Sequence, residues 1–479
     1  MWFIIKYLHK KTRALILVMF LSLIHYPATF AADLKLPAII ESHMVLQQQS
    51  EFSFWGWAKA GAAVRVKVGW LQEAKSCTVN ADGKWKLKVS TPGAGGPYKI
   101  SIAADTTIVL EDVMIGEVWF CSGQSNMQMP FNGYVSMPVA GSNDYIAHGA
   151  NSNIRLFSLT RKLSANQLDD CTGNWVVSNP ADVAKFSAVA YVFGKYVQEI
   201  LGVPIGLIHS SWGGTPIEAW MDEPTLKSGF NEVDLSGLVT GKINSQSPSV
   251  LYNAMIHPVL NYTIRGVIWY QGETNREQPE LYRRLFPAMI KSWRDNWNLG
   301  NFPFYFVQIA PYSYRFDKNT HAALLREAQL KTMIETPNSG MAVTLDIGDS
   351  LSNHPADKTS VGKRLAYWAL AKTYGIDGLA FSGPVFKSMI IEENKAILTF
   401  KHAEFGLTSF DKELRNFVIA GDDKIFQAAK AIIKDSTITV WSDRVVHPVS
   451  VRYCWENYTV GTLYNNAGLP ASSFRTDDW

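Results

Sequence analysis

Cysteine, charge and long hydrophobic stretches are all scarce in this chain of 479 residues. The four cysteines contain no Cys-x-x-Cys pair, so the spacing of common zinc sites is absent, and any disulfide pairing among them cannot be read from the sequence; they are Cys77, Cys121, Cys171 and Cys454. Charged residues make up 18% of the chain and hydrophobic residues 47%, which excludes a disordered or fibrous protein. No internal repeat or low-complexity segment is present. We therefore expect a globular protein with more than one domain.

The small net positive charge of +3 originates in the N-terminal segment. An apolar run over 14–24 is interrupted only by Ser22, and residues 29–31 have the small-x-small pattern of a cleavage site; the basic residues before the run are Lys6, Lys10, Lys11 and Arg13. This pattern predicts a secretory signal peptide over residues 1–31 and a periplasmic or extracellular protein. An uncleaved membrane anchor is the alternative, although such a short run does not span a bilayer.

Cleavage after residue 31 would change the sign of the net charge. It would remove four of the 45 Lys and Arg residues and none of the 42 Asp and Glu residues, which leaves −1. A nearly neutral protein lacks the basic surface that binds phosphates, so no nucleic-acid partner is expected. We also expect no stable membrane insertion after cleavage.

Residues 32–112 have the pattern of short antiparallel strands. Apolar residues alternate with others over part of each segment, and turn signals such as Asp82-Gly83 and Pro92-Gly93 lie between them. A β-sandwich domain is therefore predicted here. The expected strands are 52–57, 63–68, 84–89 and 98–102.

Residues 113–378 change to continuous apolar runs separated by helix-length segments, a pattern typical of a parallel α/β sheet that is buried on both faces. The runs are 117–121, 205–209, 266–270, 304–308 and 341–345, and a helix over 365–374 is expected to close this domain. Residues 379–479 return to a strand pattern at 396–400 and 437–441. They end in an irregular segment, from about residue 451, that is expected to fold back onto the main body.

Polar residues follow four of these runs. They are 123–127, 210–215, 271–275, and 346–349 leading to His354-Pro355. Ligands of open α/β sheets bind outside the carboxyl ends of the strands, so we expect these loops to converge. Ser125 would be the nucleophile and His354 its general base, while Gly213, Gly214, Gln271 or Asn275 would supply oxyanion donors.

Each of these residues also has an ordinary interpretation. Taken alone, Ser125 is typical of a helix N-cap, His354 of a loop histidine, and the two aspartates Asp346 and Asp349 of turn formers. Four polar loops after apolar strands are hard to obtain by chance, so the combination favours acyl transfer. The sequence fits neither the Gly-x-Ser-x-Gly elbow nor the chymotrypsin chain order.

These motifs resemble the sialate O-acetylesterase family of SGNH-type carbohydrate esterases. The resemblance covers nearly the whole chain after residue 31. Its motifs are 44–47, 115–119, 122–127, 212–220, 269–275, His354-Pro355 with Lys358 and Gly362, 451–453, 468–470 and 474–477.

The resemblance implies a flavodoxin-like SGNH hydrolase domain over 113–378 that removes O-acetyl groups from sugars without a metal or other cofactor. It implies Ser125 as nucleophile and His354 as base, with an oxyanion hole built from the Ser125 NH, the Gly213-Gly214 turn and a side chain from 271–275. Ser350 lies in a Gly-Asp-Ser-Leu motif but just before the histidine, so it is a poor nucleophile candidate.

The acid that orients His354 is left open by the sequence. Family members commonly carry Asp two or three residues before the histidine, where this chain has Ser352 and Leu351. Asp349 is the first candidate and Asp346 the second, and Glu273 is a third that could instead bind substrate. A Ser-His dyad is the alternative.

An acetylated sugar or oligosaccharide is the expected partner. Acetylxylan or another acetylated polysaccharide is the alternative substrate, and a non-catalytic sugar-binding protein is the alternative class, favoured by the 12% aromatic content. Trp212, Trp269 and Tyr270 would be sugar platforms or core residues. The candidates for binding a sialate carboxylate are Arg276, Arg326 and Lys358.

Overall fold

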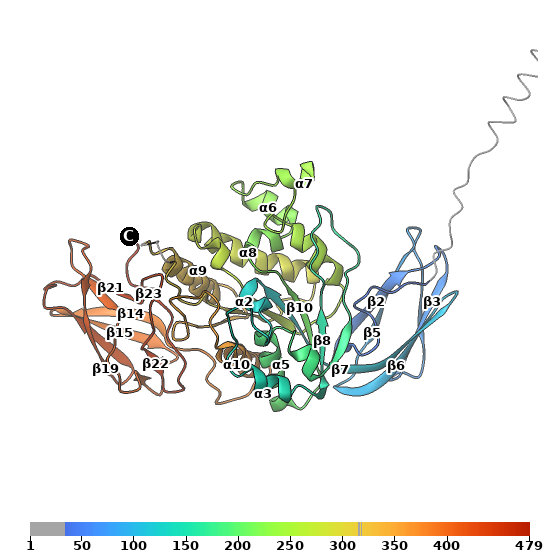
Figure 1. The fold of residues 1–479 in the computed structure, drawn as a ribbon, viewed down its shortest axis with the longest axis horizontal. Helices are drawn as coiled ribbons and strands as arrows, with labels where there is room; N and C mark the ends of the chain where they lie inside the picture. Colours follow the sequence, from blue (N-terminus) through green and yellow to red (C-terminus); the bar gives the residue numbers. More distant parts are fainter. Residues whose placement is uncertain (1–33, 315–316, 318) are drawn as a thin grey trace, which may run out of the picture.

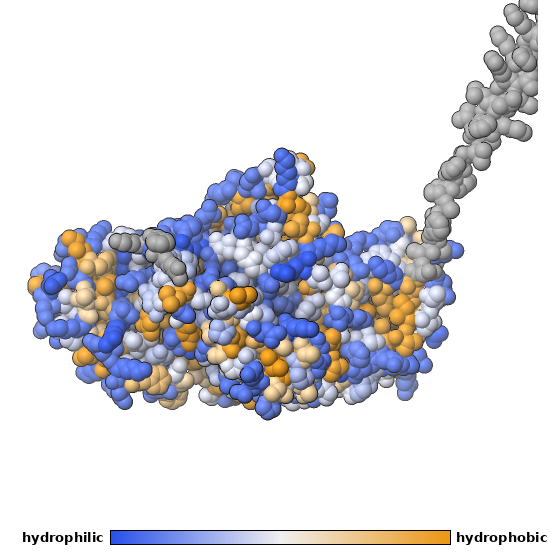
Figure 2. Space-filling model, in the orientation of Figure 1, coloured by the Kyte–Doolittle hydropathy of each residue, from blue (hydrophilic) through white to orange (hydrophobic). Residues whose placement is uncertain are grey.

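The computed structural model describes residues 34–314, 317 and 319–479, so the predicted signal peptide lies outside the described residues. Three parts lie in a row: an N-terminal β region, a central α/β part and a C-terminal β region (Figure 1). The face drawn in Figure 2 is mainly hydrophilic, with hydrophobic residues gathered over the N-terminal β region at the right. Among the described residues, no helix is long and apolar enough to cross a bilayer.

The N-terminal β region consists of paired short strands. β2 pairs with β5, while β3 pairs with β4 and β6, all antiparallel. β3 coincides with the expected strand, and β2, β5 and β6 extend one to three residues beyond theirs at one or both ends. The strands are β1 (Val45–Gln47), β2 (Glu51–Trp57), β3 (Ala63–Val68), β4 (Lys75–Thr78), β5 (Lys84–Ser90) and β6 (Gly95–Ala103).

One long strand, β7 (Thr107–Gly123), belongs to both the N-terminal and the central sheet. Its first half pairs with β6 and β1, and its second half pairs with β10 and β11. The strand runs through the expected domain boundary at residue 112, where Asp112 has a φ of 53°. The Asp112 carboxylate accepts a hydrogen bond from Arg155 at 3.1 Å and holds the strand at this bend.

The central sheet has the order β13-β12-β11-β7-β10-β8-β9, and all of its pairs are parallel except β8 with β9. Its other strands are β8 (Asn151–Ser158), β9 (Trp175–Ser178), β10 (Ile205–Ser211), β11 (Gly266–Tyr270), β12 (Phe304–Val307) and β13 (Ser339–Ala342). The α/β class is as predicted. Neither β8 nor β9 was among the expected strands.

The five strands that the sequence predicted lie in the flavodoxin order, 2-1-3-4-5, that the resemblance implied. Counted along the chain they are β7, β10, β11, β12 and β13, and β10 and β11 lie on either side of β7. β8 and β9 extend this sheet beyond β10, because the long connection over residues 124–150 carries the chain past the position that β10 later takes next to β7.

Helices cover both faces of this sheet. Trp119 and Cys121 of β7 belong to the core under α5 and α10, whereas Val118 and Phe120 face the core under α8 and α9. The long helices are α5 (Ala188–Leu201), α8 (Pro279–Trp297), α9 (His321–Glu335) and α10 (Lys358–Trp368), which a π-helical turn (Ala369–Thr373) extends. The shorter helical segments are α2 (Ser125–Gln128), α3 (Ser142–Ala147), α4 (Pro180–Val183), α6 (Glu223–Gly229), α7 (Ser236–Thr240), η1 (Ile217–Trp220), η2 (Tyr252–Ile256), η3 (His257–Val259) and η4 (Glu273–Asn275). The helix expected to close this domain, α10, begins at Lys358, seven residues before the expected start at residue 365.

The C-terminal region forms three small antiparallel sheets. Their orders are β14-β15-β20-β19, β18-β17-β21-β23 and β16-β22. The strands are β14 (Val385–Glu392), β15 (Lys395–Lys401), β16 (Leu407–Thr408), β17 (Phe417–Ala420), β18 (Gln427–Ala428), β19 (Lys430–Lys434), β20 (Thr437–Trp441), β21 (Ser450–Tyr453), β22 (Tyr464–Asn465) and β23 (Phe474–Arg475).

The last segment folds back onto α9, as expected. The fully buried guanidinium of Arg326 donates to Ser473 Oγ at 2.9 Å and to the Cys454 carbonyl at 3.2 Å. Arg475 makes a bidentate ion pair with Glu327, with both distances 3.0 Å. These charge-assisted contacts fix the end of the chain to the central part. All four cysteines are free thiols.

Candidate active site

The carboxyl ends of three neighbouring strands meet at one level. In the sheet register, Gly123 at the end of β7 lies opposite Ser211 of β10 on one side and Tyr270 of β11 on the other. The chain leaves β7 toward one side of the sheet and returns to build the other side from β11 onward. This is a topological switch point, where ligands of open α/β sheets bind.

Gly123 is required for the approach of these strand ends. Its φ is 142°, and a Cβ built on it would lie 2.1 Å from the Tyr270 carbonyl oxygen. The next NH, that of Gln124, donates to the same oxygen at 2.9 Å, and the Trp212 NH donates to the Gly123 carbonyl at 3.1 Å. The loops after β7, β10 and β11 are therefore tied together as expected.

Ser125 is the first residue of α2, at the centre of this arrangement. A Cβ on Gly213 would lie 3.1 Å from Ser125 Cβ, so the loop after β10 lies against the serine. The Gly213 NH donates to Gln128 Oε1 at 2.7 Å. Within the described chain, the NH groups of Ser125 and Gly214 donate no hydrogen bond, so these two remain available to an oxyanion.

The two amide side chains expected near the oxyanion join loops to each other. Gln271 Nε2 donates to Asn275 Oδ1 at 2.7 Å, and Asn275 Nδ2 donates to Glu218 Oε2 at 2.8 Å. Asn275 Oδ1 also accepts from the Ile217 NH at 2.9 Å. This network fixes η1 against the loop after β11, and an oxyanion role for either amide stays a prediction.

His354 is brought toward Ser125 by two neighbouring contacts. The Tyr134 hydroxyl donates to the Ser125 carbonyl at 3.0 Å, and the Tyr134 ring packs edge-on against the His354 ring at 5.4 Å between centroids. Asn126 Nδ2 donates to the Asn353 carbonyl at 2.9 Å. Asn126, next to the nucleophile, thus holds Asn353, next to the histidine, and Tyr134 contacts both Ser125 and His354.

The imidazole of His354 is favoured in its neutral form. Neither ring nitrogen has a hydrogen-bond partner among the described groups. Burial, with a smaller contribution from the positive charge of Lys358, lowers the pKa of His354 to about 4. A neutral imidazole is the form that accepts a proton from a serine.

Asn126 lies at the centre of a buried polar cluster. Its Oδ1 accepts from Lys358 Nζ at 2.5 Å, and its Nδ2 donates to Glu273 Oε1 at 2.6 Å. The other Glu273 oxygen is enclosed and has no partner among the described residues. Burial lowers the pKa of Lys358 to about 7 and raises that of Glu273, while each group's charge favours the charged form of the other.

Asp346 and Asp349, the first candidates for the orienting acid, are bonded elsewhere. Asp346 forms a bidentate pair with Arg364 at 2.8 and 2.6 Å. Asp349 is exposed and accepts from the Leu351 NH at 2.7 Å. Neither carboxylate bonds to His354. Glu273, the third candidate, is connected to the histidine loop through Asn126.

Two of the expected sugar platforms are core residues instead. Trp269 and Tyr270 are fully buried because β11 is covered on both faces, and Trp269 packs edge-on against Trp220 and Trp293. A sugar cannot reach either ring from the surface. Trp212 is half-buried, and its position next to Gly213 keeps it a candidate substrate contact.

The three cations proposed for a substrate carboxylate are engaged in the protein. Arg276 pairs with Asp317 and Glu277 and stacks over Tyr314 at 3.9 Å. Arg326 is buried against the C-terminal segment, and Lys358 belongs to the Asn126 cluster.

Two contact residues of the site carried no signal in the sequence. Tyr134 donates to the Ser125 carbonyl, and Gln128 accepts from the Gly213 NH of the loop after β10. No motif pointed to Tyr134, whereas Gln128 follows the serine motif directly. The role of Asn126 was also missed, although it is adjacent to Ser125 in that motif.

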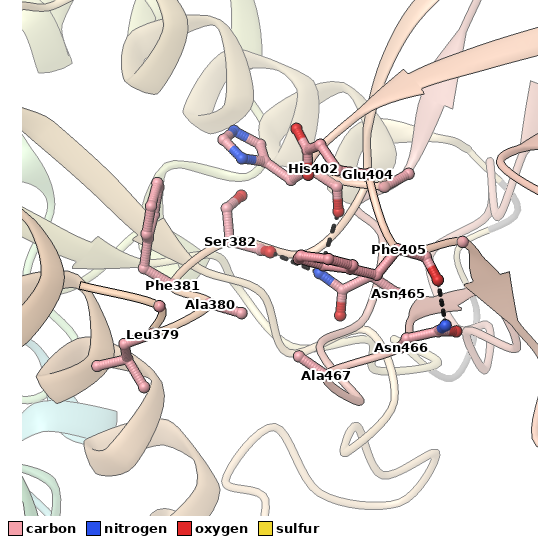
Figure 3. Close-up of a pocket in the computed structure, with 13 residues that line it drawn as sticks. Leu379, Ala380, Phe381, Ser382, His402, Glu404, Phe405, Asn465, Asn466 and Ala467 are labelled. Atoms are coloured by element: carbon pink, nitrogen blue, oxygen red, sulfur yellow. Dashed lines mark hydrogen bonds between the residues drawn. The ribbon is translucent and has the colours of Figure 1, made fainter. Parts of the chain in front are cut away.

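A separate cavity of about 690 Å³ lies between the segment after α10 and the C-terminal strands (Figure 3). It contains both a serine and a histidine, but Ser382 Oγ donates to the Gly383 carbonyl and His402 packs edge-on against Phe381 at 5.3 Å. None of its lining residues comes from the loops around Ser125. In the part of the chain that the structure describes, no group of three or more His, Cys, Asp or Glu residues is arranged to hold a metal.

Comparison with known proteins identifies relatives over most of the chain. Sialate O-acetylesterase from Mus musculus is 31% identical over 455 residues, which cover 82% of this chain and 81% of the mouse protein. The Homo sapiens protein of the same name is 30% identical over 485 residues, 92% of each chain. The crystal structure of a carbohydrate acetylesterase from Xanthomonas citri matches with a TM-score of 0.86 and 36% identity, covering 93% of this chain and all of that one.

The family model described as carbohydrate esterase, sialic acid-specific acetylesterase matches residues 115–371. This range begins within β7 and ends within the turn after α10, so it contains the four loops described above. Together with the relatives that match along nearly the whole length, this match shows that the chain belongs to the sialic acid-specific acetylesterase family of carbohydrate esterases.

Proposed function

We propose that this protein is a carbohydrate O-acetylesterase of the sialate type, in which Ser125 attacks the acetyl carbonyl and His354 is the general base. The main support is geometric: the loops after β7, β10 and β11 start at one level, and contacts through Asn126 and Tyr134 tie the serine to the histidine loop. Membership of the family and the names of the relatives agree with this activity.

The reaction proceeds through an acetyl-enzyme. His354 accepts the Ser125 proton as Oγ attacks the acetyl carbon, and the NH groups of Ser125 and Gly214 donate to the oxyanion. The C–O bond to the sugar breaks, and the His354 proton goes to the departing sugar oxygen. Water then attacks the acetyl carbon, with His354 as base, and releases acetate and Ser125.

Three single variants, compared by their kcat, identify the acid that orients His354. Glu273→Gln is expected to lower kcat most, because Glu273 connects through Asn126 to the backbone beside His354. Asp349→Asn is expected to have little effect, since this exposed carboxylate only closes a turn. Asp346→Asn should act on stability through Arg364. Similar mild losses of kcat in all three variants would favour a Ser-His dyad.

The activity itself is tested by acetate release from O-acetylated sialic acid and from acetylated xylan, measured side by side. The wild-type protein should hydrolyse at least the first, and Ser125→Ala should abolish release while its circular dichroism and unfolding midpoint stay unchanged. Retained activity in Ser125→Ala would overturn the assignment of the nucleophile. Binding of sugars without any turnover would identify a sugar-binding protein, and turnover of xylan alone a polysaccharide acetylesterase.

The proposal includes export and assignment to the SGNH-type esterases with flanking β domains. The N-terminal pattern of basic residues, apolar run and small-x-small site supports cleavage before Ala32. N-terminal sequencing of the protein from the periplasm or medium should begin at Ala32, and an intact Met1 would contradict cleavage.

A further inference from the structure

One exposed cation, Arg161, lies over an aromatic ring in the loop next to the nucleophile and has no anionic partner among the described residues. Arg161 follows β8, and within the described residues its guanidinium forms no ion pair and no hydrogen bond. Among the residues that the structure describes, its one close polar or aromatic contact is with the Trp212 ring, whose centre lies 5.5 Å from the guanidinium carbon. This cation is therefore free to bind an anion from solvent.

The Trp212 ring connects Arg161 to the catalytic loop. The Trp212 NH donates to the Gly123 carbonyl at 3.1 Å, and the following residue, Gly213, lies against Ser125 Cβ. The charge of Arg161 also acts on Tyr134: burial raises the pKa of this phenol to about 12, and Arg161 opposes the rise. Tyr134 contacts both Ser125 and His354, so the charge of Arg161 acts on a residue that touches the reacting groups.

The segment that carries Arg161 is anchored on both sides of it. The Thr160 NH donates to the Thr172 carbonyl at 2.7 Å, which closes the base of the loop. Farther along, the Ser164 NH donates to the Val250 carbonyl at 3.1 Å and the Leu168 NH to the Asn253 carbonyl at 2.9 Å. These backbone contacts fix the segment on both sides of Arg161, and the fold thereby holds its guanidinium near Trp212.

We infer that Arg161, held against the Trp212 ring, binds the carboxylate of an acidic O-acetylated sugar and makes the site selective for anionic over neutral sugars. This inference rests on the proposed esterase function. A guanidinium binds a carboxylate through two parallel hydrogen bonds, and Arg161 retains its donors for this purpose. Arg276, Arg326 and Lys358 are not free to do so, because each is bonded within the protein.

The test compares an O-acetylated sialic acid with its carboxyl methyl ester, in which a methyl group removes the negative charge. The wild-type protein should hydrolyse the acid with the higher kcat/KM. Arg161→Gln should lower kcat/KM for the acid roughly 10- to 100-fold, mainly through KM, and leave the methyl ester nearly unchanged. Arg161→Lys keeps the positive charge but not the two parallel NH donors of a guanidinium, so it should lower kcat/KM for the acid by a smaller factor.

Arg65→Gln is the matched control. Arg65 is exposed on β3 of the N-terminal β region and has no ion pair in the described structure. Its replacement should therefore leave kcat/KM for both substrates unchanged. Equal losses on both substrates in Arg161→Gln, or a wild-type protein that does not prefer the acid, would overturn the inference.

Failure of the proposed function would give a different result. In that case the wild-type protein would hydrolyse neither sugar nor 4-nitrophenyl acetate. If the wild-type protein instead hydrolyses acetylated xylan or 4-nitrophenyl acetate but not the acidic sugar, the esterase function stands and the role of Arg161 is wrong.

Discussion

Lys358 is an ammonium group enclosed in protein, with Asn126 as its hydrogen-bond acceptor and Glu273 as a nearby negative charge. Its positive charge also disfavours protonation of His354. The lysine therefore links the cluster behind the nucleophile to the protonation state of the base. It acts through other residues, so we describe it as a positioning residue.

Replacement of Lys358 by Met should change the pH profile of ester hydrolysis. Without the cation, the pKa of His354 rises from about 4, since a repulsive charge has been removed. The acid limb of kcat/KM for 4-nitrophenyl acetate should then move to higher pH. Lys363→Met is the control, because Lys363 is on the same helix but lies over Tyr196. An acid limb at the same pH in both variants would contradict this role.

The buried lysine also affects stability. The pKa of Lys358 is about 7 in the folded protein and about 10.4 in an unfolded chain, so between these values the unfolded state binds one more proton. The free energy of unfolding should therefore gain up to about 1.4 kcal/mol per pH unit from this group as pH rises through that window. Urea unfolding from pH 7 to 10 should show the smaller slope for Lys358→Met, and identical slopes would exclude a depressed pKa.

At the scale of elements, the end of β7 is the most constrained backbone in the site. Gly123→Ala would place a methyl group 2.1 Å from the Tyr270 carbonyl and force an unfavourable φ of 142°. We expect a loss of at least about 3 kcal/mol in unfolding free energy, together with loss of activity. Gly61 has a φ of 76° but open space around it, so Gly61→Ala should lower the unfolding free energy by only about 1–2 kcal/mol. Equal losses measured by urea unfolding would mean that the carbonyl contact is unimportant.

Elements with a local signal were predicted well from the sequence. Alternation of apolar and polar residues located β3 and β20 to the residue, because one face of each of these strands is buried. The order of strands in a sheet has no such local signal, since the pairing of β10 with both β7 and β8 joins segments that are far apart in the chain. The sequence pattern contains no signal for such pairing.

The site was predicted in part for the same reason. The motifs identified the loops around Ser125, which the structure brings together, but not the directions of individual side chains. Asp346 and Asp349 are near His354 in sequence, yet one turns to Arg364 and the other closes its own turn. Arg161 was not found at all, because its position over Trp212 depends on contacts of its loop with residues distant in the chain, such as His209, Thr172 and Val250.

For the whole molecule, Arg326 fastens the end of the chain to the central part. Arg326→Met would leave several backbone carbonyls and Ser473 without their buried donor, and we expect it to cost roughly 3 kcal/mol in unfolding free energy. Activity per folded molecule should be preserved. Arg415→Met, which removes an exposed pair with Glu413, should change stability by less than about 1 kcal/mol.

Urea unfolding and KM for the acidic sugar distinguish the two roles considered for Arg326. A structural role lowers stability and leaves KM unchanged. A raised KM at unchanged stability would restore Arg326 as a substrate contact, as the sequence suggested.

The continuous strand β7 also limits how this protein can move and how it can be divided. Because the same backbone belongs to the N-terminal sheet and to the catalytic sheet, no flexible linker joins these two parts. A hinge rotation between them would have to break ladder hydrogen bonds of β7. For the same reason, the N-terminal β region is not a detachable module: a cut near residue 112 would leave β7, the strand that leads to the nucleophile, without two of its four neighbours, β1 and β6.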